Sequence, residues 1–196
     1  MVVPASKSPR KPRLTAQDWA DAALAAIRAG GLAAVAVEPI AARLGATKGS
    51  FYWHFNGRDA LVEAALARWE ERETEAVIAA VGEDGTPRER LRRLLAITSA
   101  AAEREPDAIE LALQADAAHP AVAPVLRRVT ERRIAYVEGL FAEYGYDDGE
   151  ARRRALMAYV GYLGHEQLAH SVRELLPRGD AARAYAESVL SILLRP

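Results

Sequence analysis

The densest group of hydrogen-bonding side chains lies between residues 47 and 58, in the sequence TKGSFYWHFNGR. Lys48 can donate to guanine O6 or N7, and Ser50 is a short, adaptable hydrogen-bonding side chain. Tyr52 and His54 can hydrogen-bond to phosphate oxygens, which fixes orientation but carries no sequence information. Gly49 has no side chain, so the backbone could approach a duplex closely. These residue types in this order indicate contact with nucleic acid.

The neighbouring apolar residues indicate which elements position this group. Ile40, Ala41 and Leu44 recur at helical spacing, and Gly45 permits a tight reversal after them. A second short helix then carries Phe51 and Phe55 four residues apart, which would pack inward. Two short helices joined by a tight turn form a helix-turn-helix. We expect its outer side to carry Thr47, Lys48, Ser50, Tyr52, Trp53 and His54.

The rest of the chain also shows helical periodicity, with no convincing alternation of a strand. Thr15 and Asp18 form a capping-box-like start, and Gly30-Gly31 ends the run that follows. Pro39 suits the first turn of the next helix. We predict an all-α protein of about nine helices. After the helix-turn-helix, the predicted helices span residues 58–81, 87–104, 107–118, 121–144, 149–173 and 180–194.

Charge is distributed unevenly along the chain. Residues 1–58 contain eight Lys or Arg against three Asp or Glu, a net charge of +5, whereas the remainder carries −6. A basic head on an acidic body suggests that only the head meets a polyanion. The composition of residues 1–14 predicts a disordered basic arm. Its Arg10, Lys11 and Arg13 either contact DNA along its backbone or groove, or only aid solubility.

Several classes of protein are disfavoured by composition. The chain contains no cysteine, so disulfides, thiolate metal sites and cysteine nucleophiles are impossible. Its N-terminus lacks the apolar run of a signal peptide, and no uncharged apolar stretch reaches the roughly 20 residues of a membrane span. We therefore expect a cytoplasmic protein without membrane partners.

The run IAARLGATKGSFYWHFNGRDALVEAAL resembles the DNA-binding segment of the TetR (tetracycline-repressor) family, and the likeness extends over about residues 15–70. The matching pattern is an Ile-Ala pair, a following Gly, Lys-Gly-Ser/Thr, an apolar residue and Tyr. The resemblance implies a DNA-binding domain at 15–57 and a helical effector-binding and dimerisation domain at 58–196. By the same resemblance, family members touch DNA at the positions of Thr47, Lys48, Gly49, Ser50, Tyr52 and His54, and a basic phosphate contact is common at Arg58.

Two positions depart from the family pattern. Where the family usually has Ser or Thr before the second helix, this chain has Val37-Glu38-Pro39, which removes a hydroxyl cap and a phosphate donor. Gly57 occupies a position where a capping Ser is frequent, and Asn56 is a candidate substitute. Neither departure touches the core of the motif.

The last two predicted helices carry apolar stripes, with Gly161 and Gly164 permitting close approach between helices. Paired across a two-fold axis, they would form a four-helix bundle, as the family does. The alternative is that the stripes close the core of a single chain. The candidate dimer-interface residues are Leu156, Tyr159, Val160, Leu163, Tyr185, Val189, Ile192 and Leu193.

An effector pocket, if present, should lie among the middle helices and be mostly apolar with a few converging polar groups. For each candidate, an ordinary structural hydrogen bond is the alternative to ligand contact. The candidate ligand-binding residues are Trp69, Glu110, Gln114, His119, Tyr136, Tyr159 and His165.

The resulting prediction is a homodimeric transcriptional repressor that binds a palindromic double-stranded operator and is released by a small-molecule effector. An activator of the same fold remains an alternative, because the sign of regulation depends on operator position. A helical protein that has lost DNA binding and an enzyme are further alternatives. Glu110, Asp116 and His119, or Glu166 and His170, could be imagined as metal ligands, but the second pair lacks Glu-x-x-His spacing. We expect no catalysis, metal or cofactor.

Overall fold

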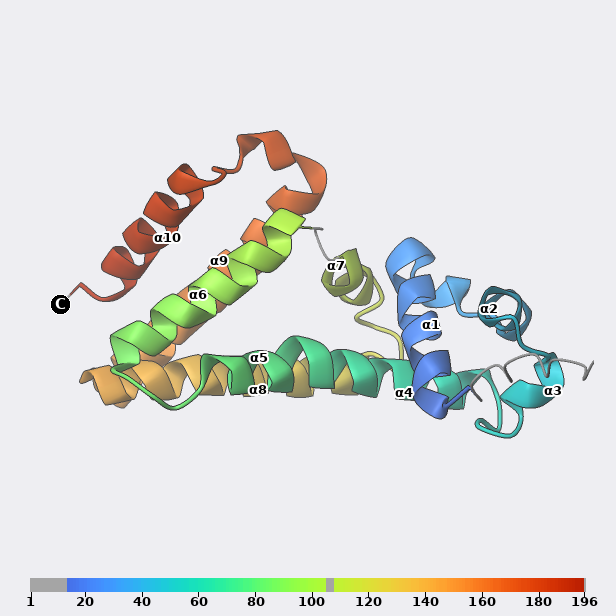
Figure 1. The fold of residues 1–196 in the computed structure, drawn as a ribbon. Helices are drawn as coiled ribbons and strands as arrows, with labels where there is room; N and C mark the ends of the chain where they lie inside the picture. Colours follow the sequence, from blue (N-terminus) through green and yellow to red (C-terminus); the bar gives the residue numbers. More distant parts are fainter. Residues whose placement is uncertain (1–13, 105–107, 196) are drawn as a thin grey trace, which may run out of the picture.

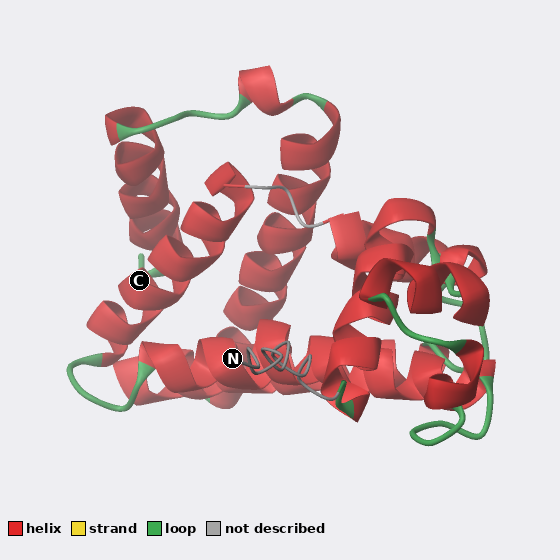
Figure 2. Cartoon of the chain, turned by 45° about the vertical axis from the view of Figure 1, so that its right-hand side comes forward, coloured by secondary structure: helices red, strands yellow, loops and turns green. Residues whose placement is uncertain are grey.

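A computed structural model describes residues 14–104 and 108–195. In this part of the chain every regular element is a helix, which confirms the predicted all-α class (Figure 2). Arg10, Lys11 and Arg13 of the predicted basic arm lie outside the described residues. The helices form a small head and a larger body (Figure 1). The head contains the helices between Ala16 and Phe51, and the body includes α6 (Pro87–Arg104), α9 (Asp148–Ser171) and α10 (Asp180–Leu193).

The prediction of one helix over residues 58–81 is confirmed in a modified form. Its central turn is a π-helix, η2, so α4, η2 and α5 follow one another without a break. Counting these three as one gives nine α-helical segments within the described ranges. The elements are α1 Ala16–Gly30, η1 Leu32–Ala34, α2 Val37–Leu44, α3 Lys48–Phe51, α4 Arg58–Glu70, η2 Glu71–Glu75, α5 Ala76–Val81, α6 Pro87–Arg104, α7 Ala108–Ala115, α8 Ala123–Tyr144, α9 Asp148–Ser171, η3 Arg173–Leu175 and α10 Asp180–Leu193.

The two ends of α1 follow directly from sequence. The Thr15 hydroxyl accepts a hydrogen bond from the Asp18 amide at 3.3 Å, while the Asp18 carboxylate accepts from the Thr15 amide at 2.7 Å. This reciprocal capping box satisfies two amides that have no partner within the helix. Gly31 ends the helix with φ of 65°, a conformation that costs glycine little.

Two predicted helices are shorter than expected. α3 ends at Phe51, and the chain continues as turns in which the His54 amide donates to the Phe51 carbonyl at 2.9 Å. α7 ends at Ala115, because Asp116 and His119 begin a turn that leads into α8. In both places local side chains and turn hydrogen bonds compete with continuation of the helix.

The first hydrophobic cluster holds the head together. Trp19 of α1 packs edge-to-face against Phe51 of α3, with 5.4 Å between ring centroids. Leu61 of α4 and Leu113 of α7 are completely buried in the same cluster. Because α7 and the beginning of α8 contribute to it, the two hydrophobic clusters do not divide at residue 58, where the sequence analysis placed a domain boundary.

The second cluster lies between α6, α8, α9 and α10, and includes Leu140, Phe141, Ala151 and Leu190. α8 also lies beside α4 and η2, as both ribbon views show (Figures 1 and 2). α8 therefore connects the two clusters.

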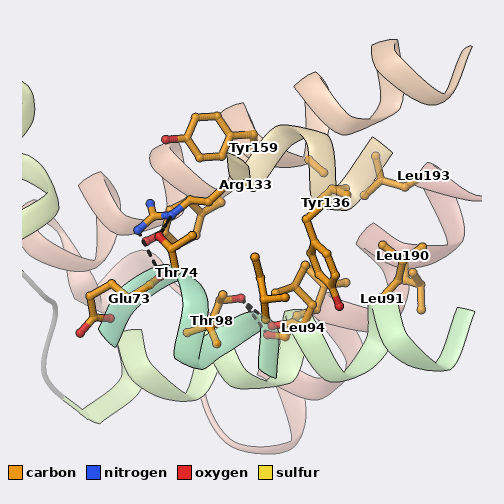
Figure 3. Close-up of a pocket in the computed structure, with 16 residues that line it drawn as sticks. Glu73, Thr74, Leu91, Leu94, Thr98, Arg133, Tyr136, Tyr159, Leu190 and Leu193 are labelled. Carbon is orange, nitrogen blue, oxygen red and sulfur yellow. Dashed lines mark hydrogen bonds between the residues drawn. The ribbon is translucent and has the colours of Figure 1, made fainter. Parts of the chain in front are cut away.

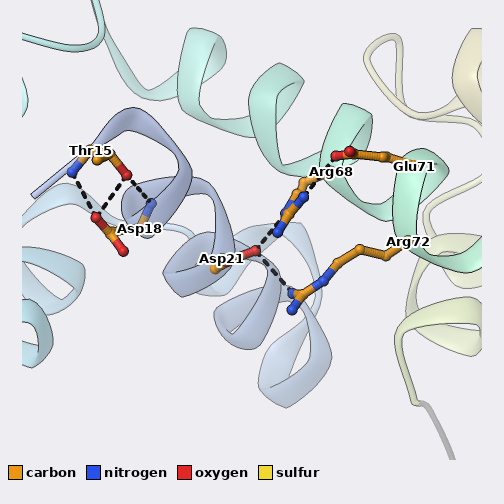
Figure 4. A network of polar contacts seen from close by, with 6 residues as sticks. All are labelled: Thr15, Asp18, Asp21, Arg68, Glu71 and Arg72. Carbon is orange, nitrogen blue, oxygen red and sulfur yellow. Dashed lines mark hydrogen bonds and ion pairs between the residues drawn. The ribbon is translucent and has the colours of Figure 1, made fainter. Parts of the chain in front are cut away.

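Charged pairs hold α4 and η2 in place on both sides. On the head side, Asp21 of α1 accepts hydrogen bonds from Arg68 and Arg72, each at 3.0 Å (Figure 4). On the body side, Arg128 of α8 donates to both carboxylate oxygens of Glu70, at 2.7 and 2.5 Å. Movement of α4 relative to the body would either break these pairs or move their partner residues with it.

Candidate nucleic-acid interface and body cavity

The helix-turn-helix is closed by a left-handed glycine and a capping threonine. Gly45, at φ 63° and ψ 33°, ends α2 in the αL conformation that side chains disfavour. The Thr47 hydroxyl accepts from the Ser50 amide at 3.2 Å and so begins α3. Phe51 is fully buried and stacks on Phe55 at 5.6 Å, which fixes α3 to the head.

The predicted contact residues lie together on and after α3, and face outward. Tyr52 is 56% exposed and Trp53 is 82% exposed. Thr47, Lys48 and Gly49 are exposed, whereas Ser50 and His54 are half-buried. A tryptophan this exposed contributes nothing to the core of a single chain, so its placement suits contact with another molecule.

Lys48 has a partner within the head. Its ammonium group donates to the carboxylate of Glu38 in the first turn of α2. That hydrogen bond lowers the pKa of Glu38, and the same contact raises the pKa of Lys48. Lys48 is therefore charged at neutral pH, and Glu38 competes with any anion for it.

Gly49 is not required by the fold of the head. A Cβ built there would come no closer than 3.8 Å to another atom, the Thr47 hydroxyl, which is ordinary van der Waals contact. The backbone does not need glycine there, so any requirement for a small residue would come from a binding partner.

Arg58 stabilises the fold of the head, which the sequence analysis did not predict. Its Nε donates to the Val35 carbonyl at 2.8 Å and its Nη2 donates to the Leu32 carbonyl at 2.6 Å. The side chain thereby ties α4 to the segment between α1 and α2. This geometry gives Arg58 a structural role in the head. The side chain is 40% exposed, and the phosphate contact stays a prediction.

At the two positions that depart from the family pattern, no other side chain supplies the missing helix cap. Ala36 precedes α2 and Gly57 precedes α4, and no side-chain hydrogen bond caps either helix. The suggestion that Asn56 substitutes for the missing serine is therefore wrong, because Gly57 is the residue in the capping position.

The body contains a cavity between η2, α5, α6, α8, α9 and α10, with about 770 Å³ of space between its walls, part of it open to solvent (Figure 3). Its surface is predominantly apolar, as is usual for sites that bind small molecules. The lining residues are Glu73, Thr74, Val77, Ile78, Leu91, Leu94, Leu95, Thr98, Arg133, Tyr136, Val137, Ala158, Tyr159, Tyr162, Leu190 and Leu193.

Of the predicted ligand-binding residues, only Tyr136 and Tyr159 line this cavity. His119 is exposed, and its Nδ1 accepts from the Ala121 amide at 3.2 Å, so it stabilises the turn before α8. Gln114 lies beside Glu110, at 3.5 Å. His165 stacks on Tyr185 of α10, in an adjoining groove between α6, α9 and α10.

Trp69 and Glu110 lie behind the cavity wall, where both contact Arg133. The Trp69 ring is completely buried in the first cluster, with the Arg133 guanidinium 5.3 Å from its centroid. Glu110 is almost fully buried and accepts from Arg133 Nη1 at 2.9 Å. Burial alone would lower the pKa of Arg133, but the charge of Glu110 raises it above its ordinary value.

Arg133 is the functional candidate that sequence reasoning missed. It belongs to a helix with several arginines, of which Arg128 and Arg132 are paired with carboxylates and about half exposed. Its position along α8 lies between the residues that belong to the two hydrophobic clusters. No local sequence pattern distinguishes it from the neighbouring arginines. Only the position of Glu110, on another helix, marks it.

Arg133 also contacts the π-helical turn. Its Nε donates to the Thr74 hydroxyl at 2.9 Å, and its Nη2 donates to the Glu73 carbonyl at 3.2 Å (Figure 3). A π-turn breaks the regular pairing of carbonyls and amides along a helix and occurs often at functional sites. The cavity wall is thus bonded to the helix that carries the head.

The predicted interface residues separate into three sets. Leu156, Val160, Tyr185 and Ile192 are exposed, with Val160 at 65%. Leu163 and Val189 are half-buried. Tyr159 and Leu193 are buried within the single chain and line the cavity, and Leu193 also lines the groove beside α10. Their place in an interface stays a prediction.

Two of the residues considered as metal ligands have other partners in the fold. Glu110 pairs with Arg133, and Asp116 accepts from the Leu32 amide at 3.1 Å. Asp116 comes so close to Gly31 that a Cβ there would lie 3.2 Å from its carboxylate. Within the described residues, no three His, Asp or Glu side chains are grouped as a metal ion would require, and no helix is long and apolar enough to span a membrane.

Comparisons with known proteins agree with this arrangement. Residues 20–65 match the family described as bacterial regulatory proteins, tetR family. A curated relative, the uncharacterised HTH-type transcriptional regulator TtgW of Pseudomonas putida, is 38% identical over 63 residues. That match covers 32% of this chain and 47% of the relative, so the alignment spans about half the relative's length.

Solved structures match most of the chain, at identities that show the fold alone. A transcriptional regulator from a Rhodococcus species superposes with a TM-score of 0.76 at 20% identity, covering 92% of this chain and 96% of that one. A TetR regulator from Legionella pneumophila gives 0.71 at 17% identity, covering 94% and 97%. FadR from Bacillus subtilis, solved with stearoyl-CoA, gives 0.69 at 17% identity, covering 92% and 98%.

The match over residues 20–65 falls on the capped helix-turn-helix that presents Lys48, Tyr52 and Trp53, and the body has the helical fold of solved TetR regulators. Residues 20–65 are therefore similar to the tetR family of bacterial regulatory proteins, and the chain as a whole shares its fold with solved regulators.

Proposed function

We propose that the protein is a DNA-binding transcriptional regulator that acts as a homodimeric repressor in the cytoplasm, has no catalytic activity, and leaves a palindromic operator when a small molecule enters the body cavity. The observation that carries the DNA-binding proposal is the exposed surface of α3 and the following turn. It combines a lysine, two exposed aromatic side chains and a glycine that the fold does not require. Recognition helices present such residues to the major groove.

On this surface, Lys48 and Ser50 are placed to contact base edges, while Tyr52 and His54 contact phosphates. Thr47 retains its hydroxyl proton for a phosphate, because its oxygen accepts from the Ser50 amide. Gly49 lets the backbone come close to the duplex. Trp53 packs against the sugar-phosphate backbone through its large exposed ring.

A second copy of the chain supplies the partner head. The exposed apolar residues of α9 and α10 flank a groove lined by Met157, Gly161, Tyr185 and Ile192. Exposed aliphatic residues grouped in this way are costly in water, and a two-fold partner would cover them. Two heads related by a two-fold axis would then contact two half-sites of a palindrome.

Effector release follows from the contacts of Arg133. A ligand in the cavity would lie against the side chain that holds the π-turn, and α4 continues from that turn into the head. A ligand that prefers one arrangement of the π-turn shifts the separation of the heads and lowers operator affinity by the free energy of that preference. Equal ligand affinity for free and operator-bound dimer would exclude this mechanism.

DNA binding is tested by selection from randomised duplexes, followed by anisotropy titration of the selected site at several salt concentrations. We expect an inverted repeat, and a salt slope that reports the number of phosphate contacts. Lys48→Ala and Tyr52→Ala should each weaken binding at least tenfold. Arg127→Ala, which removes an exposed cation on α8, serves as the charge control.

Two further variants make this test specific. Gly49→Ala should leave the free energy of unfolding unchanged or slightly higher and still weaken binding, because its Cβ is tolerated by the fold but not by a close duplex. Glu38→Gln removes the carboxylate that competes for Lys48 and should tighten binding. The DNA-binding proposal would be excluded if no sequence were selected and if the affinity for DNA were the same in all of these variants.

Dimerisation is tested by sedimentation of the full chain with Val160→Glu, which places a charge in the proposed interface. We expect a shift to monomer at concentrations where the original chain is dimeric. Ala135→Glu, at an exposed position of α8, should leave the dimer intact. A dimer unaffected by Val160→Glu would mean that the interface lies elsewhere.

A further inference from the structure

The chemistry of the effector can be inferred from the polar groups of the cavity, and this inference rests on the proposed function. The walls are aliphatic over most of their area, so each polar side chain has a large influence on what can bind. Arg133 is the cation among the lining residues, and Glu73 is the carboxylate. Glu73 points away from the other labelled side chains (Figure 3).

Arg133 is not available to an acidic ligand. Its three nitrogens donate to Glu110, Thr74 and the Glu73 carbonyl, at 2.9, 2.9 and 3.2 Å. Trp69 and Tyr162 lie within cation–π distance of the guanidinium, at 5.3 and 5.7 Å. Its charge is matched by Glu110, whose side chain is only 3% exposed. A ligand carboxylate would have to displace a buried partner to gain this cation.

Most hydroxyl groups of the lining are also satisfied within the protein. The Thr98 hydroxyl donates to the carbonyls of Leu94 and Leu95, at 3.0 and 3.2 Å. The Tyr159 hydroxyl is hydrogen-bonded to that of Thr130 at 3.1 Å. These groups therefore offer little to a ligand.

Tyr136 differs from them. Its hydroxyl is buried and has no hydrogen-bond partner among the described residues. Burial raises its pKa, so the group is a neutral phenol at physiological pH. The charged groups around it do not line the cavity: Arg90 is paired with Glu143, Arg132 is paired with Glu75, and Arg93 donates to the Asp84 carbonyl. A buried hydroxyl without a partner is unfavourable, and a ligand that supplies a partner removes this cost.

We propose that the effector is an uncharged, predominantly apolar molecule with one hydrogen-bonding group, such as an alcohol, ketone or ester, that pairs with the Tyr136 hydroxyl. An anion or a cation would lose its hydration in an apolar cavity whose cation, Arg133, is already paired with Glu110. The neighbouring Arg133–Glu110 pair forms part of the cavity wall, and its position changes with the shape of the bound ligand.

The test compares probes of one size and different charge, each below its aggregation concentration. 1-Decanol, decanoate and decylammonium form one set, and 2-naphthalenemethanol and 2-naphthoate form a second set of different shape. Binding to the full-length protein is measured by tryptophan fluorescence and calorimetry without DNA. We expect at least one neutral probe to bind, and to bind at least tenfold more tightly than its charged counterparts.

Two variants assign the site. Tyr136→Phe should weaken the neutral probe three- to tenfold, the loss of one hydrogen bond. Tyr144→Phe, at an exposed tyrosine of the same helix, should change nothing. Glu110→Gln leaves Arg133 uncompensated and should narrow the preference for the neutral probe over the carboxylate.

The inference is overturned if a charged probe binds as tightly as its neutral counterpart, if Tyr136→Phe behaves like Tyr144→Phe, or if neither alcohol binds up to its solubility. Operator anisotropy with the same probes separates this inference from the proposed function. A neutral probe that binds through Tyr136 but does not release DNA supports the cavity chemistry and excludes effector release by this route.

Discussion

The first cluster buries Trp19, Phe51 and Leu61 completely, whereas the second cluster borders an apolar cavity that is partly open to solvent. The first cluster supports a four-residue helix that could not remain folded on its own. The second cluster holds helices of 14 to 24 residues, which retain their shape around an open space. A surface that must contact DNA in one geometry needs dense packing beneath it, and a cavity that must respond to a ligand needs incomplete packing.

The connection between the two clusters is polar. Asp21 links α4 and η2 to α1 through charged hydrogen bonds (Figure 4). Glu70 and Arg133 link α4 and η2 to α8 in the same way. Such contacts depend strongly on geometry and can be exchanged without creating a void. We infer that the head and body are joined by an adjustable connection between two differently packed regions.

The largest effect is expected from opening the head cluster. Trp19→Ala should lower the free energy of unfolding by about 3–5 kcal/mol, because it leaves a cavity beneath α3. Trp53→Ala, at an 82% exposed position, should change it by less than about 0.5 kcal/mol. Denaturant unfolding followed by circular dichroism measures both. Equal effects of the two substitutions would contradict the packing described here.

Breaking the buried pair of the body should come next. Glu110→Gln leaves the charge of Arg133 uncompensated and should cost about 2–4 kcal/mol in the same measurement. Replacing both residues with Met removes the unpaired charge and should recover most of the loss. If the double substitution were as destabilising as the single one, Arg133 would matter mainly for its bonds to η2.

A smaller loss is expected at Arg58. Arg58→Met removes two hydrogen bonds to backbone carbonyls and should lower the stability of the head by about 1–2 kcal/mol, since the side chain is partly exposed. If Arg58 served only as a phosphate contact, the substitution would weaken DNA binding and leave unfolding unchanged. Comparing unfolding with the salt slope of DNA binding separates the two roles.

The smallest effect concerns Glu70, whose pKa is lowered by its hydrogen bonds to Arg128. A carboxylate with a lowered pKa in the folded state stabilises the protein above its unfolded pKa, and this contribution disappears as the pH falls through the folded pKa. Glu70→Gln should therefore cost up to about 1 kcal/mol at pH 7, and nothing at a pH below the folded pKa. A difference that is independent of pH would show that the ion pair is not responsible.

Local sequence determined the head almost completely. Capping by Thr15 and Thr47, the αL glycine at Gly45 and the spacing of Phe51 and Phe55 are short-range signals, so the helix-turn-helix and its outward residues could be predicted. The family match over residues 20–65 covers this same segment. The helices of the body were also predicted from their separators, with boundary errors where turns replaced the last helical residues.

The tertiary structure alone decided which side chains meet in the body. Arg133 is 23 residues from Glu110 and about 60 from Thr74, and Tyr136 faces leucines of α6 and α10. Periodicity shows that a residue such as Tyr159 or Leu193 lies on an apolar stripe, but not whether that stripe faces a partner chain or a cavity. This depends on the crossing of helices distant in sequence, because burial is a property of the packed chain and not of the local pattern.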